Sequence, residues 1–331
     1  FVTDEILKGR GIVWKEGFSG KNLIPKPDLV ITTGAHGGLS NPEAVFARSE
    51  GIPTITHAEA LAKVAAGKDT IAVCGVGGKT TTSSMLAVML GSAGINPSFA
   101  IGVGNIFPIG TPGKYIKDGK HFICEADEFA VSPGTNNTPR FSFLKPKIVV
   151  VTNIEHDHPD IYPTIEETKK TFREFFEKLS QDGFLVACID NPNVAETIRR
   201  LNVPIATYGE SPEADWRIGD IKYEAGKVGF SLTNSSKTVK DISIRVPGDY
   251  NVLNAAAAYV VGKFLGLTDV VLKKGLWEYS GCKRRFVVGG EGRGVTIVDD
   301  YAHHPKELKA VLSAARKWYP SRRVVAVFQP H

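Results

Sequence analysis

The sequence predicts an α/β fold in which a parallel sheet is covered by helices on both faces. Apolar, strand-like runs alternate along the chain with helix-like segments, which is typical of repeated βαβ units. The run 147–153 is apolar and β-branched at successive positions, as in a strand that is buried on both faces. With 331 residues, the chain is long enough for two or three domains.

Composition and charge favour a globular protein that binds small anionic ligands. Hydrophobic residues make up 42% of the chain and charged residues 23%, and the formal net charge is only +5. Basic residues are spread out apart from the short clusters 283–285 and 322–323, which argues against a nucleic-acid partner. No apolar run approaches the ~18–20 residues of a membrane span. The four cysteines are far apart and include no CxxC pair, which favours a reducing compartment. We therefore expect a cytoplasmic protein without a signal peptide.

The first 69 residues form a short α/β unit in this interpretation. Asn41 and Pro42 are a helix start, with an N-cap residue followed by proline at the first helical position. Residues 65–69 are expected to link this unit to the next. The predicted strands are 28–33 and 52–56, and the predicted helices are 41–48 and 57–64.

A longer unit follows from residue 70. Phe172, Phe175, Phe176 and Leu179 recur at helical spacing and predict an amphipathic helix. Short alternating runs over 215–246 predict antiparallel strands. Asn251 is expected to be the N-cap of an alanine-rich helix. The remaining strands are predicted at 71–74, 121–127, 147–153, 183–190 and 203–208, and the helices at 80–90, 164–179 and 251–265.

A third unit begins near Arg284. Its predicted elements are a strand at 294–299, a helix at 305–318 that starts with proline, and a strand at 323–328. Because the sequence stops directly after this β-α-β unit, we expect this domain to be incomplete.

The most informative segment is a glycine loop at 75–82 between a buried strand and a helix. Gly75, Gly77 and Gly78 allow a sharp turn and bring backbone N–H groups close to a ligand. Lys79 and Thr80 then begin a helix whose N-terminus attracts anions. The lysine suits β- and γ-phosphates and the hydroxyl suits Mg²⁺, so the loop predicts a nucleotide-phosphate site.

Two further polar clusters, 125–128 and 153–158, follow predicted strands of the same sheet. In open α/β sheets, ligands bind beyond the carboxyl ends of the strands. Thr80 together with one acid is a reasonable first Mg²⁺ site. A histidine could serve a second metal or the reacting phosphate. Each acid or histidine taken singly could also be a solvated loop residue, and a zinc site is weakly supported because no cysteine accompanies His156 and His158.

Taken together, these motifs resemble the ATP-dependent Mur ligases of peptidoglycan synthesis. The resemblance extends over most of residues 25–331 and depends on seven motifs in family order. These are Gly-x-x-Gly-Lys-Thr-Thr at 75–81, Glu-Ala-Asp-Glu at 125–128, Thr-Asn-Ile-Glu-x-Asp-His at 152–158, Pro-Gly-x-x-Asn-x-x-Asn at 247–254, Lys-Arg-Arg-Phe at 283–286, Asp-Asp-Tyr-x-His-His-Pro at 299–305 and Phe-Gln-Pro-His at 328–331.

The resemblance implies a three-domain architecture with a central P-loop ATPase domain. Residues 1–69 would be the domain that binds the UDP-linked substrate, 70–283 the central ATP-binding domain and 284–331 the domain that brings the amino acid. The first and third would be Rossmann-like, and both are expected to be truncated.

The resemblance also implies roles for individual residues. Lys79 would hold the β- and γ-phosphates. Thr80 and Glu125 would bind Mg²⁺, and His158 would serve a second metal. The catalytic residues would be Lys79, Glu125 and His158. The residues implied to bind the nucleotide are Gly75, Gly77, Gly78, Lys79, Thr80, Thr81, Asn251, Asn254, Arg285 and Asp300, of which Arg285 and Asp300 would close over ATP from the hinge and the C-terminal domain.

The implied reaction joins L-alanine to UDP-N-acetylmuramate through an acyl phosphate, with ATP and Mg²⁺ as cofactors. Three alternatives stay open: the sibling ligase that attaches a tripeptide to the same sugar, a folylpolyglutamate synthase, which fits the motifs poorly, and a nucleotide-binding remnant without ligase activity. The oligomeric state is not predicted.

Two positions and one spacing depart from the family pattern. Gly77 and Tyr250 stand where this branch usually has histidine. The spacing from Glu125 to His158 is longer than usual, and the extra length falls in a predicted loop at 131–139, which we expect near the substrate carboxylate.

Overall fold

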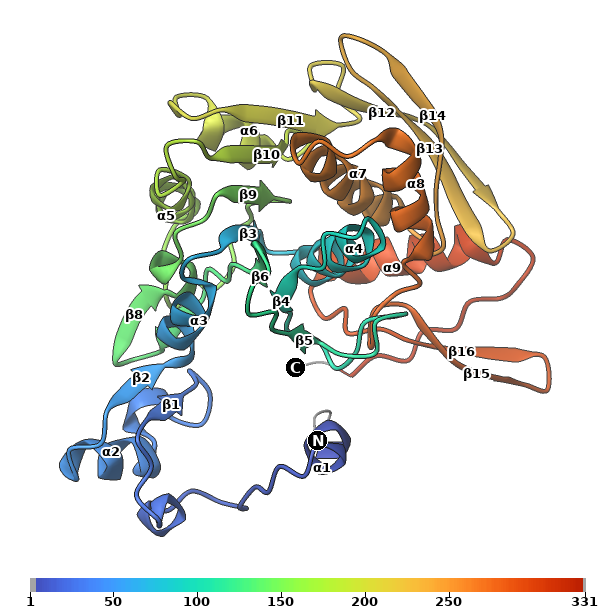
Figure 1. The fold of residues 1–331 in the computed structure, drawn as a ribbon. Helices are drawn as coiled ribbons and strands as arrows, with labels where there is room; N and C mark the ends of the chain where they lie inside the picture. The colour runs from blue at the N-terminus through green and yellow to red at the C-terminus, as the bar shows by residue number, and fades with distance from the viewer. Residues whose placement is uncertain (1–3, 330–331) are drawn as a thin grey trace.

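The computed structural model describes residues 4–329 and confirms a mixed α/β fold around one large sheet (Figure 1). A short N-terminal unit precedes the sheet. After helix α1 (Asp4–Gly9), two parallel strands, β1 (Val30–Thr32) and β2 (Thr54–Thr56), pair beside helices α2 (Pro42–Ser49) and α3 (His57–Ala65). Asn41 caps α2 by accepting a hydrogen bond from the Glu43 amide, so the predicted helix start is confirmed.

The central sheet has ten strands in the order β14-β13-β12-β11-β10-β9-β3-β6-β4-β5. The run from β12 to β4 is parallel, whereas β5 at one end and β13 and β14 at the other are antiparallel. The antiparallel strands predicted over 215–246 are therefore confirmed. The bounds are β3 Asp69–Cys74, β4 Ser98–Ala100, β5 Gly113–Lys114, β6 His121–Glu125, β9 Ile148–Val151, β10 Phe184–Cys188, β11 Ile205–Gly209, β12 Trp216–Glu224, β13 Lys227–Thr233 and β14 Thr238–Ile244.

Helices cover both faces of this sheet, as the apolar strands predict (Figure 1). Helices α4 (Lys79–Ser92), α7 (Asp249–Phe264) and α8 (Asp269–Glu278) pack on one face, and α5 (Ile165–Phe176) and α6 (Pro192–Ile198) pack on the other. Within β3, Ile71 and Val73 belong to the first core, while Ala72 and Cys74 belong to the second. All four cysteines are buried free thiols.

A small hairpin interrupts the path from β6 to β9. Strands β7 (Ala130–Ser132) and β8 (Asn136–Pro139) pair antiparallel and lead into a 3₁₀ turn, η3 (Arg140–Phe143). The segment 131–139, predicted as a loop, is thus an ordered hairpin, and it contacts the short turn η2 (Gly38–Ser40) of the N-terminal unit.

The described part of the C-terminal unit, up to residue 329, consists of a β-hairpin and one helix. Strands β15 (Val287–Gly292) and β16 (Val295–Asp299) pair antiparallel, and α9 (Pro305–Trp318) has the predicted bounds. Helix α9 lies against β12, and Lys317 of α9 forms an ion pair with Asp249 at the start of α7.

Other details of the sequence interpretation are also wrong. Residues 323–328 form no strand: no described strand pairs with them, and Val327 is 98% exposed. Helix α4 continues past Gly91, which lies in open space and does not interrupt the helix. Asn251 is not an N-cap, since Gly248 occupies that position and Asn251 lies inside the first turn. The sequence interpretation also overlooked the helices α1, α6 and α8 and the strands β4, β5 and β15.

None of the helices among residues 4–329 combines the length and apolar composition required to span a lipid bilayer. The last two residues of the Phe-Gln-Pro-His motif lie outside the described part of the chain.

Candidate active site

The glycine loop joins the end of β3 to the N-terminus of α4. Gly75 has φ +125° and Gly78 has φ +85°, conformations that side-chain-bearing residues rarely adopt. A Cβ at Gly75 would lie 2.2 Å from the Thr152 Oγ1 atom, so the backbone here also needs the space. Both glycines are required by the turn that delivers Lys79 to the first position of α4.

Residues that follow β9 hold the loop in place. The Thr152 hydroxyl donates to the Gly77 carbonyl at 2.6 Å, and the Asn153 side chain both donates to that carbonyl and accepts from the Gly77 amide, each at 2.9 Å. Gly77 itself does not need to be glycine: its φ is not left-handed, and a Cβ would make ordinary contacts with Asn153 and, at 3.8 Å, with Glu307 of α9.

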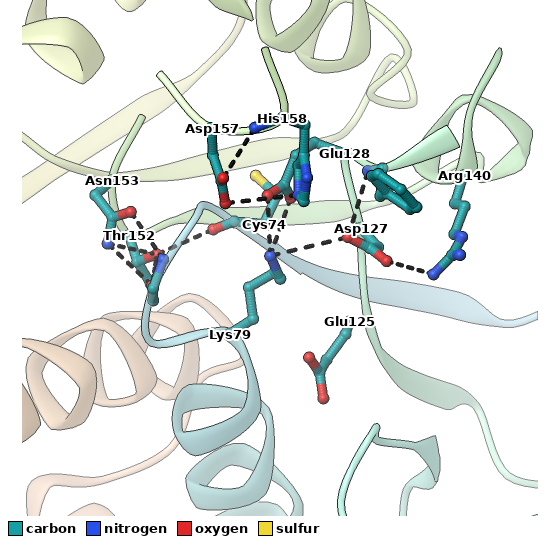
Figure 2. A network of polar contacts seen from close by, with 12 residues as sticks. Cys74, Lys79, Glu125, Asp127, Glu128, Arg140, Thr152, Asn153, Asp157 and His158 are labelled. Carbon is teal, nitrogen blue, oxygen red and sulfur yellow. Dashed lines mark hydrogen bonds and ion pairs between the residues drawn. The ribbon is translucent and has the colours of Figure 1, made fainter. Parts of the chain in front are cut away.

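Lys79 points into a cluster of carboxylates (Figure 2). Its ammonium lies 3.0 and 3.2 Å from the two Glu128 oxygens and 4.0 Å from Asp127 Oδ1. Burial opposes the charged form of Lys79, but the carboxylates of Glu128 and Asp127 outweigh it and raise the pKa of Lys79. Burial also raises the pKa of Glu128, which is 2% exposed, although Lys79 counteracts the shift. Lys79 is therefore a firmly charged cation at the helix N-terminus.

Glu125 and Thr80 meet on a different side of Lys79. The Thr80 hydroxyl donates to Glu125 Oε2 at 3.1 Å, and the Gly102 amide donates to Oε1 at 2.7 Å. Burial raises the pKa of Glu125, and these contacts together with Lys79 oppose the shift. Figure 2 shows the Glu125 side chain apart from the Glu128 cluster. The structure thus brings together the two residues that the resemblance implies as Mg²⁺ ligands.

His158 belongs to a second group of possible metal ligands. One ligand atom from each of Glu128, Asp157 and His158 lies within 4.8 Å of the other two. Phe129 supports the imidazole from one side, with ring centroids 4.4 Å apart. Glu128 and Asp157 were not among the predicted site residues, although both lie inside motifs that the sequence displays. Which acid of the Glu-Ala-Asp-Glu motif faces Lys79 depends on where β6 ends.

Asn251 and Asn254 project from α7 toward the glycine loop. Thr82 Oγ1 donates to Asn254 Oδ1 at 3.1 Å, and Asn254 Nδ2 donates to Asn251 Oδ1 at 3.1 Å. Asn251 Nδ2 donates to the Pro247 carbonyl at 2.6 Å. The two amides thus fix α7 against α4 beside the loop.

A cavity of about 260 Å³ lies between the glycine loop, α7 and α9. It combines apolar walls with convergent polar groups, which is the usual composition of a small-molecule site. Of the predicted site residues, it is lined by Gly77, Gly78, Thr80, Thr81, Asn251, Asn254, Arg285 and Asp300; Gly75, Lys79, Glu125 and His158 are not in its lining.

Asp300 organises the connection between the central and C-terminal units. Its carboxylate accepts hydrogen bonds from the Phe286 amide at 2.8 Å and the Ala302 amide at 2.7 Å. Burial raises the pKa of Asp300, and these amides oppose the shift. Arg284 and Phe286 have left-handed φ values of +63° and +52°, so the backbone on both sides of Arg285 is strained. Lys306 of α9 adds an ion pair to Glu155 at 2.7 Å.

The fold and the site define an α/β protein built around a P-loop, in which a lysine and several carboxylates converge at the carboxyl ends of parallel strands. A model of the Mur ligase middle domain matches residues 73–262, and a model of the Mur ligase glutamate ligase domain matches residues 284–331. The chain belongs to the Mur ligase family.

Curated relatives of this chain bear the name UDP-N-acetylmuramate–L-alanine ligase. One from Pelobacter propionicus is 42% identical over 95% of this chain and 66% of its own length. Another, from Desulfosudis oleivorans, is 41% identical over 100% of this chain and 69% of its own length. The chain therefore spans about two thirds of the length of the curated relatives that it matches.

Solved structures share the fold. UDP-N-acetylmuramate–alanine ligase from Thermotoga maritima superimposes with a TM-score of 0.81 at 24% identity, covering 99% of this chain and 72% of that one. A murein peptide ligase from Psychrobacter arcticus gives a TM-score of 0.74 at 23% identity, covering 96% of this chain and 69% of that one. At these identities the similarity supports the fold alone.

Proposed function

We propose that this chain is the catalytic part of an ATP-dependent, ADP-forming ligase that joins L-alanine to UDP-N-acetylmuramate. The observation that supports this most strongly is the convergence of Lys79, Thr80 and Glu125 at the glycine loop of a Mur ligase middle domain. The names of the curated relatives supply the substrates. The reaction belongs to the cytoplasmic stage of peptidoglycan synthesis.

The proposed nucleotide position follows from the cavity beside the glycine loop. The triphosphate would lie along the loop, with Lys79 at the β- and γ-phosphates and the N-terminus of α4 facing the charge. The base would occupy the cavity beside Asn251 and Asn254. Arg285 and Asp300 would close this cavity from the hinge.

The oxygen donors of the two candidate ligand sets suit a hard divalent cation such as Mg²⁺. Thr80 and Glu125 offer a hydroxyl and a carboxylate, and Glu128, Asp157 and His158 offer two carboxylates and an imidazole. A bound cation would neutralise charge on the phosphates.

The chemistry that this arrangement supports is activation of a carboxylate. A carboxylate oxygen of the sugar's lactyl group attacks the γ-phosphorus of ATP, and the bond to the bridging oxygen breaks to release ADP. The amine of L-alanine then attacks the acyl carbon, inorganic phosphate leaves, and the nitrogen loses a proton to form the amide. Phosphoryl transfer requires positioning and charge neutralisation rather than covalent catalysis, and Lys79 and the helix N-terminus provide these.

Phosphate release separates the candidate functions. The chain is incubated with Mg²⁺, ATP and UDP-N-acetylmuramate, together with either L-alanine or the tripeptide of the sibling ligase. Release that depends on L-alanine supports the proposal. Release that depends only on the tripeptide would move the assignment to the sibling ligase, and ATP binding without release in either mixture would leave a nucleotide-binding remnant.

A further inference from the structure

The hairpin β7–β8 places Arg140 beside the catalytic cluster. Its strands pair Ala130 with Pro139 and Ser132 with Asn136, so the chain returns toward the Glu-Ala-Asp-Glu motif. The Arg140 amide donates to the Phe129 carbonyl at 2.9 Å, and the Phe141 amide donates to the Asp127 carbonyl at 3.0 Å. These backbone bonds fix the origin of the Arg140 side chain relative to Asp127.

The guanidinium of Arg140 binds the carboxylate of Asp127, which lies near the Lys79 ammonium and would compete with phosphates for it. Arg140 Nη1 donates to Asp127 Oδ2 at 2.7 Å, while the other Asp127 oxygen lies 4.0 Å from the Lys79 ammonium. Arg140 Nε donates to the Ala130 carbonyl at 3.2 Å, and this hydrogen bond helps to hold the guanidinium in its orientation toward Asp127. Both side chains of the Arg140–Asp127 pair are about one-third exposed, at 30% and 31%, so solvent screens the pair only in part.

We propose that Arg140 is a positioning residue of the catalytic site: its guanidinium neutralises Asp127 and so leaves the Lys79 ammonium available to nucleotide phosphates. The inference rests on the proposed function, because it assigns Lys79 to a phosphate. Two carboxylates flank Lys79. Glu128 has Asp157 and His158 beside it to share a cation, whereas Asp127 has Arg140.

A second set of contacts connects Arg140 to His158. The guanidinium lies over the Phe129 ring, 5.3 Å from its centroid, and the same ring contacts the His158 imidazole, at 4.4 Å between centroids. Arg140 therefore also restrains the aromatic ring on which the candidate metal ligand rests.

The same hairpin is held from the N-terminal unit. The Leu39 amide donates to Ser132 Oγ at 3.0 Å, and a Cβ at Gly34 would lie 2.7 Å from Arg140 Nη2. The loop that follows β1 thus packs directly against the guanidinium. Because a Cβ at Gly34 would also lie 2.9 Å from the Val131 carbonyl oxygen, this position has no room for a side chain.

The test measures MgATP binding by isothermal titration calorimetry with the full chain. Arg140→Gln should weaken binding by roughly 10- to 100-fold, because the uncompensated Asp127 charge, 4.0 Å from the Lys79 ammonium, then competes with the phosphates for that cation. Adding Asp127→Asn should restore binding to within about threefold of the Asp127→Asn variant, because the uncompensated charge is then gone. Lys145→Gln, the same charge change at an exposed neighbouring position, should bind like the unmodified chain.

Two results would overturn the inference. Either Arg140→Gln binds MgATP normally, or its defect persists in the double variant, which would mean that Arg140 merely anchors the hairpin through the Ala130 carbonyl. If the unmodified chain binds no MgATP, the proposed function fails instead. Urea unfolding of the unmodified chain, the two single variants Arg140→Gln and Asp127→Asn, and the double variant then tests the pair directly. Neutralisation predicts non-additive effects of the two substitutions on the free energy of unfolding, and additive effects refute it.

Discussion

Removing the Lys79 ammonium should destabilise the fold through Glu128, in addition to abolishing phosphate binding. Glu128 is 2% exposed and lies 3.0 Å from Lys79 Nζ, so Lys79→Ala leaves a buried carboxylate without its cation. Breaking a buried pair typically costs about 3–5 kcal/mol. Because Glu128 can take up a proton instead of remaining charged, we expect a loss of about 2–4 kcal/mol near pH 7.5.

The pH dependence of the free energy of unfolding shows whether the buried Glu128 carboxylate causes this loss of stability. Burial already raises the pKa of Glu128 in the folded state, and Lys79 opposes this shift. Without Lys79 the folded pKa rises further above the unfolded value, so the folded state binds more protons between the two values. Stability must therefore fall as the pH rises through this window and be regained as the pH falls toward the unfolded pKa of Glu128.

Urea unfolding between pH 5 and pH 8 measures this effect. The difference between Lys79→Ala and the unmodified chain should shrink toward pH 5, and the double variant Lys79→Ala/Glu128→Gln should recover most of the loss. Lys120→Ala, which removes a 73% exposed lysine from its pair with Asp69, should change stability by less than ~1 kcal/mol. A loss that is independent of pH and persists in the double variant would refute the reasoning.

Further substitutions test the loop and its support. Gly75→Ala should destabilise the chain and abolish MgATP binding, because the residue has φ +125° and the new Cβ would lie 2.2 Å from the Thr152 hydroxyl oxygen. Gly91→Ala in α4 places its Cβ in open space and should stabilise the chain by up to ~1 kcal/mol. Equal melting temperatures for the two variants would contradict this expectation. Asn254→Ala should cost about 1–3 kcal/mol in urea unfolding, because it leaves the fully buried Thr82 hydroxyl without its acceptor, and an unchanged midpoint would show that this hydrogen bond contributes nothing.

Where the local sequence itself dictates the structure, the prediction is accurate. Pro305 at the first helical position and the amphipathic pattern behind it define α9, and the structure gives the predicted bounds. The apolar run 147–153 likewise predicts a strand covered on both faces, and in β9 the side chains of Ile148 and Val150 belong to one core while those of Val149 and Val151 belong to the other. The glycine loop is recognisable for the same reason: only glycine accepts the conformations at Gly75 and Gly78.

Where the structure depends on strand pairing or on the orientation of a side chain, the local sequence is not sufficient to predict it. Residues 323–328 have the composition of a strand, but a strand forms only beside a partner, and none of the described strands pairs with them. Asn251 has the chemistry of an N-cap, yet Gly248 begins the helix and Asn251 donates to the Pro247 carbonyl instead.

The site shows the same limit. The motif 125–128 predicts acids near the loop, but it does not reveal that Glu125 faces Thr80 while Glu128 faces Lys79. Their orientations depend on the end of β6 and on the hairpin that follows it.

The central claim is that this site activates a carboxylate by transferring the γ-phosphoryl group of ATP to it. UDP-N-acetylmuramate with ¹⁸O in both lactyl carboxylate oxygens tests the claim directly when it is incubated with the chain, Mg²⁺, ATP and L-alanine. When an acyl phosphate reacts with the amine, one of the original carboxylate oxygens leaves with the phosphate. Mass spectrometry should therefore find one ¹⁸O atom in each phosphate released. Phosphate that is released together with amide product but has no ¹⁸O would contradict the account.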